Sequence, residues 1–249
     1  MYRNRFTIRL LGTFEVARDG SAPIRLWPKP RALLAQLLVA DAPVPMRRIV
    51  AELWPREAPE SATVNVRGYV HLIRRALGTD AVQTLHDGVY AVRLPGAQVD
   101  YRMFLDLLDR SRTTDVPPER IIHLKRALAL CGGPVLSDVP HGPMLGNWVA
   151  SVQDHRRRAL LELAALLIHG GRCDDAQRLL RSHLLEQAAD ETAYMLLMQA
   201  LYAAGDGGAA LAVYRQAYRE LARIGMLPGP RLSALQDAVL HHHPLPAGS

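Results

Sequence analysis

The fold is decided by the stretch ESATVNVRGYVHLIRRALG at residues 60–78. At 100° per residue its apolar side chains gather into one stripe, which consists of Ala62, Val66, Tyr69, Val70, Ile73 and Leu77. Gly78 suits the position just after a helix, where a left-handed backbone is common. The stretch therefore predicts an amphipathic helix from about residue 60 to residue 77, with one face in a core.

The opposite face of this helix is rich in arginine and carries no acidic residue beyond its first position. A solvated surface helix would normally mix acids with bases, although ordinary solvated arginines are the alternative interpretation. Arg67 can reach O6 and N7 of guanine in the major groove, and Val64 can touch a thymine methyl group. Gly68 leaves room for a close approach, and we assign Arg74 and Arg75, which come later in the helix, to phosphates.

The sequence on either side of this helix predicts a winged helix-turn-helix. Residues 6–10 and 13–16 alternate with period two and predict strands, and a turn at 19–20 precedes a third strand at 23–26. Two short helices follow, one from about Pro30 and one from Met46 to Trp54. After the long helix, residues 82–86 and 89–94 flank an Asp-Gly turn and predict a hairpin. The candidate DNA-binding residues of the helix and the hairpin are Thr63, Val64, Arg67, Gly68, His71, Arg74, Arg75 and His86.

Residues 100–240 carry only helical periodicity. Two stretches superimpose at an offset of 34 residues, which is the period of tetratricopeptide (TPR) helix pairs. The aligned positions are Leu160, Leu163, Ala164, Leu167, Ala176 and Leu180 in one stretch, and Tyr194, Leu197, Met198, Leu201, Ala210 and Tyr214 in the other. Helices at about 101–111 and 118–130 could form a degenerate first repeat, and 231–240 a capping helix. The predicted fold class is therefore α+β followed by all-α, with a winged helix-turn-helix domain over residues 1–97 and a TPR-like helical domain over residues 98–249.

The excess positive charge lies in the first part of the chain. Residues 1–95 contain 13 arginines and one lysine against eight acidic residues, a net charge of +6, whereas residues 96–249 contain 16 basic and 16 acidic residues. A basic domain joined to a neutral one is typical of a DNA-binding module with an uncharged partner module, and an incidental surface bias is the alternative. Double-stranded DNA is therefore the expected partner.

Other functions find little support in the sequence. It lacks the motifs of metalloproteases, phosphate-binding loops, serine hydrolases and redox dithiols, so we expect no enzyme, no catalytic residue and no cofactor. The histidines at 241–243 stand in a terminal tail and predict a frayed end rather than a metal site. Cys131 and Cys173 predict idle thiols in a reducing cytoplasm. No apolar run approaches the roughly 20 residues that span a bilayer, and residues 1–5 do not resemble a secretion signal. We therefore expect no membrane partner and a cytoplasmic, nucleoid-associated protein.

Several motifs, taken as a set, resemble the Streptomyces antibiotic regulatory proteins. They are PKPRALLA at 28–35, LW at 53–54, YVHLIRRALG at 69–78, DGVY at 87–90, GPVLSD at 133–138 and GMLPGP at 225–230. The similarity covers nearly the whole chain in order and spacing. Three departures stand out: Cys131 where tryptophan is common, Leu72 where arginine is frequent, and Arg67-Gly68 where pairs such as Gln-Thr are usual. We interpret the first as a packing change and the others as signs of a different operator or phosphate contact.

The resemblance implies an OmpR-type winged helix joined to a bacterial transcriptional activation domain. It further implies an activator of a secondary-metabolite biosynthetic gene cluster that binds direct repeats beside the promoter and engages the RNA polymerase holoenzyme. Paired half-sites on one face of the DNA also predict a homodimer on DNA. Two other classes stay open: a TPR-type protein-interaction scaffold, against which the arginine-rich face argues, and a ligand-gated repressor with a small molecule in the helical domain.

Overall fold

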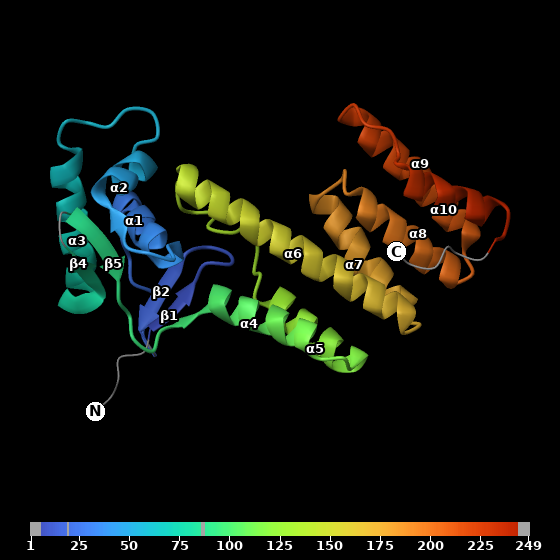
Figure 1. The fold of residues 1–249 in the computed structure, drawn as a ribbon, viewed down its shortest axis with the longest axis horizontal. Helices are drawn as coiled ribbons and strands as arrows, with labels where there is room; N and C mark the ends of the chain where they lie inside the picture. Colours follow the sequence, from blue (N-terminus) through green and yellow to red (C-terminus); the bar gives the residue numbers. More distant parts are fainter. Residues whose placement is uncertain (1–5, 19, 86–87, 244–249) are drawn as a thin grey trace. The chain divides into compact units, whose positions relative to one another are not determined.

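The structure, a computed structural model of the chain, describes residues 6–18, 20–85 and 88–243 (Figure 1). The chain divides into two compact units. The first unit contains residues 1–109 and 126–156, and the second contains residues 110–125 and 157–249. This division falls inside three helices, α4 (Asp100–Thr113), α5 (Pro117–Ala129) and α6 (Pro143–His169).

Two small three-stranded sheets belong to the first unit. In one, β1 (Phe6–Arg9) lies between β2 (Glu15–Arg18), its antiparallel partner, and β6 (Gln98–Val99), its parallel partner. The other has the order β3-β5-β4, with antiparallel pairing throughout, and its strands are β3 (Val44–Pro45), β5 (Val89–Val92) and β4 (Val82–Thr84). Strands β4 and β5 form the hairpin that the sequence predicts.

The strand predicted at residues 23–26 is wrong. These residues have no strand geometry, and the N–H of Ile24 donates to the carbonyl of Val16 at 2.8 Å. Pro23 has no N–H and cannot donate to a ladder. The segment therefore runs as an irregular connection from β2 to the first helix.

Three helices complete the winged helix-turn-helix: α1 (Pro28–Val39), α2 (Met46–Leu53) and α3 (Ala62–Leu77). Helix α3 packs against both α1 and α2. Its buried stripe is the predicted one, with Val66, Val70 and Ile73 at most 2% exposed and Tyr69 half-buried. Gly78 ends the helix with a φ of +117°, a conformation that favours glycine. A short 3₁₀ turn, Thr79–Ala81, leads into the hairpin. The predicted fold class of this half is confirmed.

Glu52, in α2, caps the N-terminus of α6 within the first unit. Its buried side chain accepts hydrogen bonds from the backbone N–H groups of Gly142, Met144 and Leu145 at 2.7, 2.7 and 3.1 Å. The first N–H groups of a helix have no partner inside the helix, so a carboxylate there satisfies them and meets the positive end of the helix dipole. A side chain on Gly142 would collide with the backbone of Glu52, so glycine is required at this contact.

Two further carboxylates of the first unit, Asp100 and Asp138, accept hydrogen bonds from the connection between β1 and β2. Asp100 accepts the backbone N–H groups of Leu10 and Leu11 at 2.9 and 3.0 Å, and Asp138 accepts the N–H of Phe14 at 2.8 Å. Burial raises the pKa of Asp100 above its ordinary value, although these backbone donors lower it. Asp138 also forms an ion pair with Arg31 at the start of α1. Residues beyond the winged helix therefore complete its hydrogen bonding.

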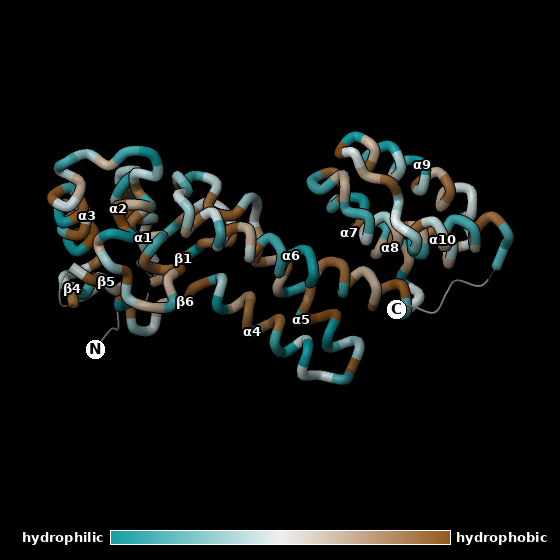
Figure 2. Tube along the Cα trace, turned by 45° about the horizontal axis from the view of Figure 1, so that its top comes forward, coloured by the Kyte–Doolittle hydropathy of each residue, from teal (hydrophilic) through white to brown (hydrophobic). Residues whose placement is uncertain are grey.

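The second unit consists of helices and turns, with no strand among its described residues. After α6 come α7 (Cys173–Glu186), α8 (Glu191–Ala203), α9 (Gly207–Arg223) and α10 (Pro230–Leu240). Helix α8 packs against α7 and α9, and α10 packs against α8 and α9, as predicted for a capping helix. All repeat positions are buried except Tyr214, which is half-buried. Figure 2 shows the alternation of hydrophilic and hydrophobic segments along these helices. The predicted TPR-like helical region is confirmed.

Asp190, just before α8, joins three helices of the second unit. It accepts two hydrogen bonds from Arg157 of α6, both at 2.7 Å, one contact of 2.8 Å with Nε2 of His183 in α7, and the N–H of Ala193 at 3.3 Å. Burial alone would raise the pKa of Asp190, but the hydrogen bonds from His183 and Arg157 hold it well below its ordinary value. The carboxylate is therefore charged in the folded protein.

Among the described residues, no helix combines the length and the apolar composition of a membrane span.

Candidate nucleic-acid interface

Helix α3 exposes the face that carries the candidate residues. The exposed members are Thr63, Val64, Arg67, Gly68, His71 and Arg75. The opposite face of the helix is the buried stripe that packs on α1 and α2. The structure thus brings these six residues together on one open surface, beside the hairpin formed by β4 and β5 (Figure 1).

Three basic side chains form a line along this surface. Arg67, His71 and Arg75 are four residues apart, so each lies about one helical turn, roughly 6 Å, beyond the last. Within the part of the chain that the structure describes, none of the three has a hydrogen-bond or ion-pair partner. Their donors are therefore available to groups outside the chain, and a row of N–H donors that includes two arginines suits the phosphates and guanine edges of DNA.

Gly68 has no packing reason to be glycine. A Cβ atom at this position would meet nothing within 4 Å. Glycine in a helix interior destabilises the helix by about 1 kcal/mol relative to alanine, so the fold would be more stable with a side chain here. Packing within the described chain therefore does not account for the glycine, and the close approach predicted for this position stays a prediction.

Val64 adds an apolar contact point one turn before this glycine. Its side chain is 64% exposed. A single exposed valine is common on protein surfaces, but this one lies on the same face as Arg67, three residues away. The methyl groups are therefore accessible for the thymine contact that the sequence predicts.

Arg74 is held by the hairpin. Its Nε donates to the carbonyl of Val82 and its Nη2 donates to Oγ1 of Thr84, both at 2.8 Å. The side chain is half-buried, whereas Arg75 next to it is exposed. Arg74 thus fixes β4 against the last turns of α3. The sequence predicts a phosphate contact for Arg74, and its internal contacts favour a positioning role.

His86, the eighth candidate, lies outside the described residues, so its role stays a prediction. Beside it, the N–H of Leu85 donates to the carbonyl of Val89 at 2.8 Å, and Gly88 has a φ of +71°. Both features are those of the turn that the Asp-Gly pair predicts.

Side chains behind α3 support it, and sequence analysis did not single out all of them. The rings of Trp54 and Tyr69 stack with centroids 6.3 Å apart, and the ammonium of Lys29 lies 4.8 Å from the Trp54 ring. Lys29 also donates to the carbonyl of Leu53. Arg18 of β2 donates to the carbonyl of Ala76, at 3.4 Å. The sequence identifies Trp54 as inward-facing, but it has no signal for Lys29 or Arg18 because their partners are backbone carbonyls.

Known proteins share both the sequence and the architecture. Residues 99–240 match the family model Bacterial transcriptional activator domain. The chain is 32% identical over 249 residues to the regulatory protein AfsR of Streptomyces coelicolor, covering 94% of this chain and 24% of AfsR. It is 27% identical to the transcriptional regulator RedD of the same species, covering 96% of this chain and 71% of RedD.

The architecture also matches a solved structure. The structure of Mycobacterium tuberculosis EmbR in complex with a low-affinity phosphopeptide is similar with a TM-score of 0.83 and 25% sequence identity, covering 98% of this chain and 66% of that one. The transcriptional regulatory protein EmbR of M. tuberculosis is 27% identical over 255 residues, which is 98% of this chain and 65% of EmbR. The chain therefore spans about a quarter of AfsR and about two thirds of EmbR.

Proposed function

The chain belongs to the Streptomyces antibiotic regulatory protein family and carries a bacterial transcriptional activator domain, and from this premise we propose that it activates transcription by binding double-stranded DNA through α3. The family is one of transcriptional regulators and not of enzymes. The observation that carries the proposal is the exposed line of Arg67, His71 and Arg75, which has no partner in the described chain and surrounds a glycine that the fold does not need.

The residues divide by the part of DNA that each would meet. Arg67 and Val64 read base edges, because they stand on the exposed face of the first half of α3. Thr63 and His71 lie on the same face and add polar contacts. Gly68 admits close approach of the DNA backbone.

The later part of α3 and the hairpin would grip the DNA rather than read it. Arg75 is exposed near the C-terminal end of α3 and binds phosphate. Arg74 holds the hairpin in place through β4. His86 is retained as a contact on sequence grounds alone.

Two protein partners are proposed, a second copy of the chain and the RNA polymerase holoenzyme. A homodimer on direct repeats about one helical turn apart would set two α3 helices on one face of the DNA. The helical domain would engage the RNA polymerase holoenzyme, because TPR-like stacks form protein-binding surfaces and residues 96–249 have no net charge to bind phosphates. A secondary-metabolite gene cluster is the proposed target, supported by the family.

The proposed division of labour assigns DNA binding to residues 1–97 and activation to residues 98–249. The family model starts at residue 99, and the positive excess lies in residues 1–95. Packing does not follow this division, because Asp100 and Asp138 complete the hydrogen bonding of the winged helix. Experiments on DNA binding therefore require the full chain.

The test is fluorescence anisotropy of the full chain with a labelled duplex from its own upstream region and a scrambled duplex. Affinity for the upstream duplex should exceed that for the scrambled one, and it should fall by orders of magnitude between about 50 and about 200 mM salt because several phosphates are contacted. Arg67→Ala combined with Arg75→Ala should abolish the preference, whereas Arg102→Ala, at an exposed arginine of α4, should not. Salt-insensitive binding, or an equal effect of the control, would refute the proposal.

Transcription in vitro with polymerase then tests activation. The full chain should raise transcript yield from its promoter at a concentration that saturates the duplex. Saturated DNA without any gain in transcript would refute activation, and a fall in transcript would favour the repressor alternative.

A further inference from the structure

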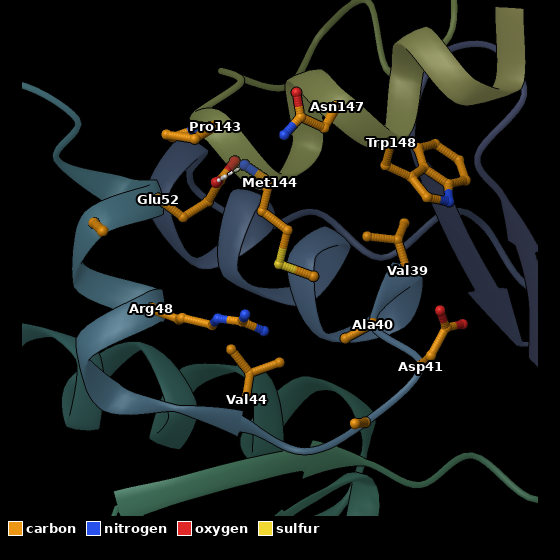
Figure 3. A pocket seen from close by; sticks show the side chains of 12 residues that line it. Val39, Ala40, Asp41, Val44, Arg48, Glu52, Pro143, Met144, Asn147 and Trp148 are labelled. Carbon is orange, nitrogen blue, oxygen red and sulfur yellow. Dashed lines mark hydrogen bonds between the residues drawn. The ribbon is translucent and has the colours of Figure 1, made fainter. Parts of the chain in front are cut away.

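The first unit contains a cavity of about 520 Å³, bounded by α2, the C-terminal end of α1 and the first turns of α6 (Figure 3). This volume falls within the roughly 300–1,000 Å³ that is usual for small-molecule sites. The apolar part of the wall comes from Val39, Val44, Met144 and Trp148. The indole of Trp148 is held in place by Tyr101, whose ring meets it edge-on with centroids 4.9 Å apart. The space is open to solvent on one side, where Arg48, Ala51 and Asn147 are exposed, and it can cover the apolar body of a small organic molecule.

One free cation reaches into this space. Figure 3 shows the Arg48 side chain extending from α2 between Val44 and Met144. In the described ranges of the chain, the Arg48 guanidinium has no hydrogen-bond or ion-pair partner. The nearby carboxylate of Glu52 is not available to it, because that side chain is buried and accepts three N–H groups of α6. Arg48 therefore brings an unneutralised, donor-rich group to a mostly apolar wall.

The second acidic residue of the wall lies at another end of the cavity. Figure 3 shows Asp41 below Trp148 and apart from Arg48. Asp41 is thus on the side of Trp148, whose ring Tyr101 contacts, and after the larger effect of burial its negative charge helps to raise the pKa of Tyr101. An anion would be repelled from this end and attracted to the Arg48 end. A bound acid would therefore orient with its carboxylate toward Arg48 and away from Asp41.

We propose that this cavity binds a small organic acid, with its carboxylate on Arg48 and its apolar body against Val39, Met144 and Trp148. A planar guanidinium binds a carboxylate through two parallel hydrogen bonds, which are among the stronger polar contacts in proteins. The bound molecule would touch α2 and α6, the helices that Glu52 joins. Binding involves no DNA, so the proposal stands or fails separately from the proposed function.

The test is isothermal titration calorimetry of the full chain with 4-phenylbutyrate, and with 4-phenylbutanamide as the uncharged analogue. The acid should bind saturably at one site per chain, and the amide at least about tenfold more weakly because it loses the charge-assisted pair. Arg48→Met, which keeps the apolar stem, should weaken the acid to the same degree. Arg47→Met is the matched control, because Arg47 is exposed like Arg48 and adjacent to it on α2 but does not line the cavity, and it should leave affinity unchanged.

A second variant tests the location independently of charge. Ala51 lines the cavity from the exposed side of α2, so Ala51→Phe should fill the space and abolish binding without disturbing a core. Absence of saturable binding by the folded wild-type chain would overturn the proposal. Equal affinity of Arg48→Met and wild type, or unimpaired binding by Ala51→Phe, would overturn it as well.

Discussion

Replacing Gly68 with alanine should move stability and DNA binding in opposite directions. Gly68 is the seventh residue of the 16-residue helix α3, where a Cβ atom would meet nothing within 4 Å. The backbone at this position is helical and needs no glycine. Gly68→Ala should therefore raise the free energy of unfolding by about 0.5–1 kcal/mol, the usual difference in helix propensity between the two residues.

The same methyl group should weaken binding to DNA. If the glycine is present because a phosphate or sugar comes within van der Waals distance of the helix, a Cβ atom there pushes α3 outward and lengthens the contacts of Arg67 and His71. A loss of about 1.4 kcal/mol or more corresponds to at least tenfold in the dissociation constant. Larger side chains at this position should weaken binding further.

The assay pairs urea denaturation with anisotropy on the upstream duplex. Gly146→Ala is the matched control, because Gly146 is also helical, also has open space around its Cβ position, and stands in α6 instead of α3. It should stabilise the protein to a similar degree and leave DNA affinity unchanged. Unchanged affinity in Gly68→Ala, or a loss of stability, would show that the reasoning from open space is wrong.

The remaining predictions concern other contacts. Arg67→Ala should cost about 1–3 kcal/mol of binding free energy at one operator position. Arg75→Ala should weaken binding to all duplexes alike and flatten the salt slope by about one unit. Identical affinity profiles of the two variants on a panel of operator duplexes would contradict the assignment. Arg74→Met should speed amide exchange in β4, which Arg75→Met should not, and equal exchange would remove its positioning role. Asp190→Asn should lower the free energy of unfolding by about 2 kcal/mol near neutral pH, less than for a fully buried pair because Arg157 is 40% exposed. Because the folded pKa of Asp190 is depressed below 3.8, this difference in the free energy of unfolding should stay constant down to about pH 4 and shrink as pH falls further. Urea unfolding at a series of pH values measures it, and a difference that grows below pH 4 would contradict the prediction.

Local periodicity was enough to predict the elements that matter most. The stripe on α3 and the repeat positions of the second unit are buried as expected, because a helix with one apolar face has one stable way to bury it. The strand predicted at 23–26 failed for a local reason as well, since Pro23 and the close start of α1 leave too little backbone for a ladder. Sequence patterns were reliable where the partner of a residue lay within a few turns.

Contacts across long stretches of chain could not be predicted. Glu52 meets Gly142, 90 residues away, and Asp100 meets Leu10 over the same separation. The guanidinium of Arg31 likewise meets Asp138, 107 residues away. A carboxylate or guanidinium has no periodicity of its own, so its partner follows only from the tertiary structure.

These long-range contacts also change what the charge of the chain means. A net charge of +6 over residues 1–95 says nothing about where on the domain it lies. In the structure, Arg9 pairs with Glu15 at 3.3 Å, and Arg31 pairs with Asp138, which belongs to the neutral half of the sequence. The arginines on α3 that face outward have no such acids in the described chain. Acidic partners thus neutralise Arg9 and Arg31, whereas the outward-facing arginines of α3 keep a charge that can attract DNA phosphates.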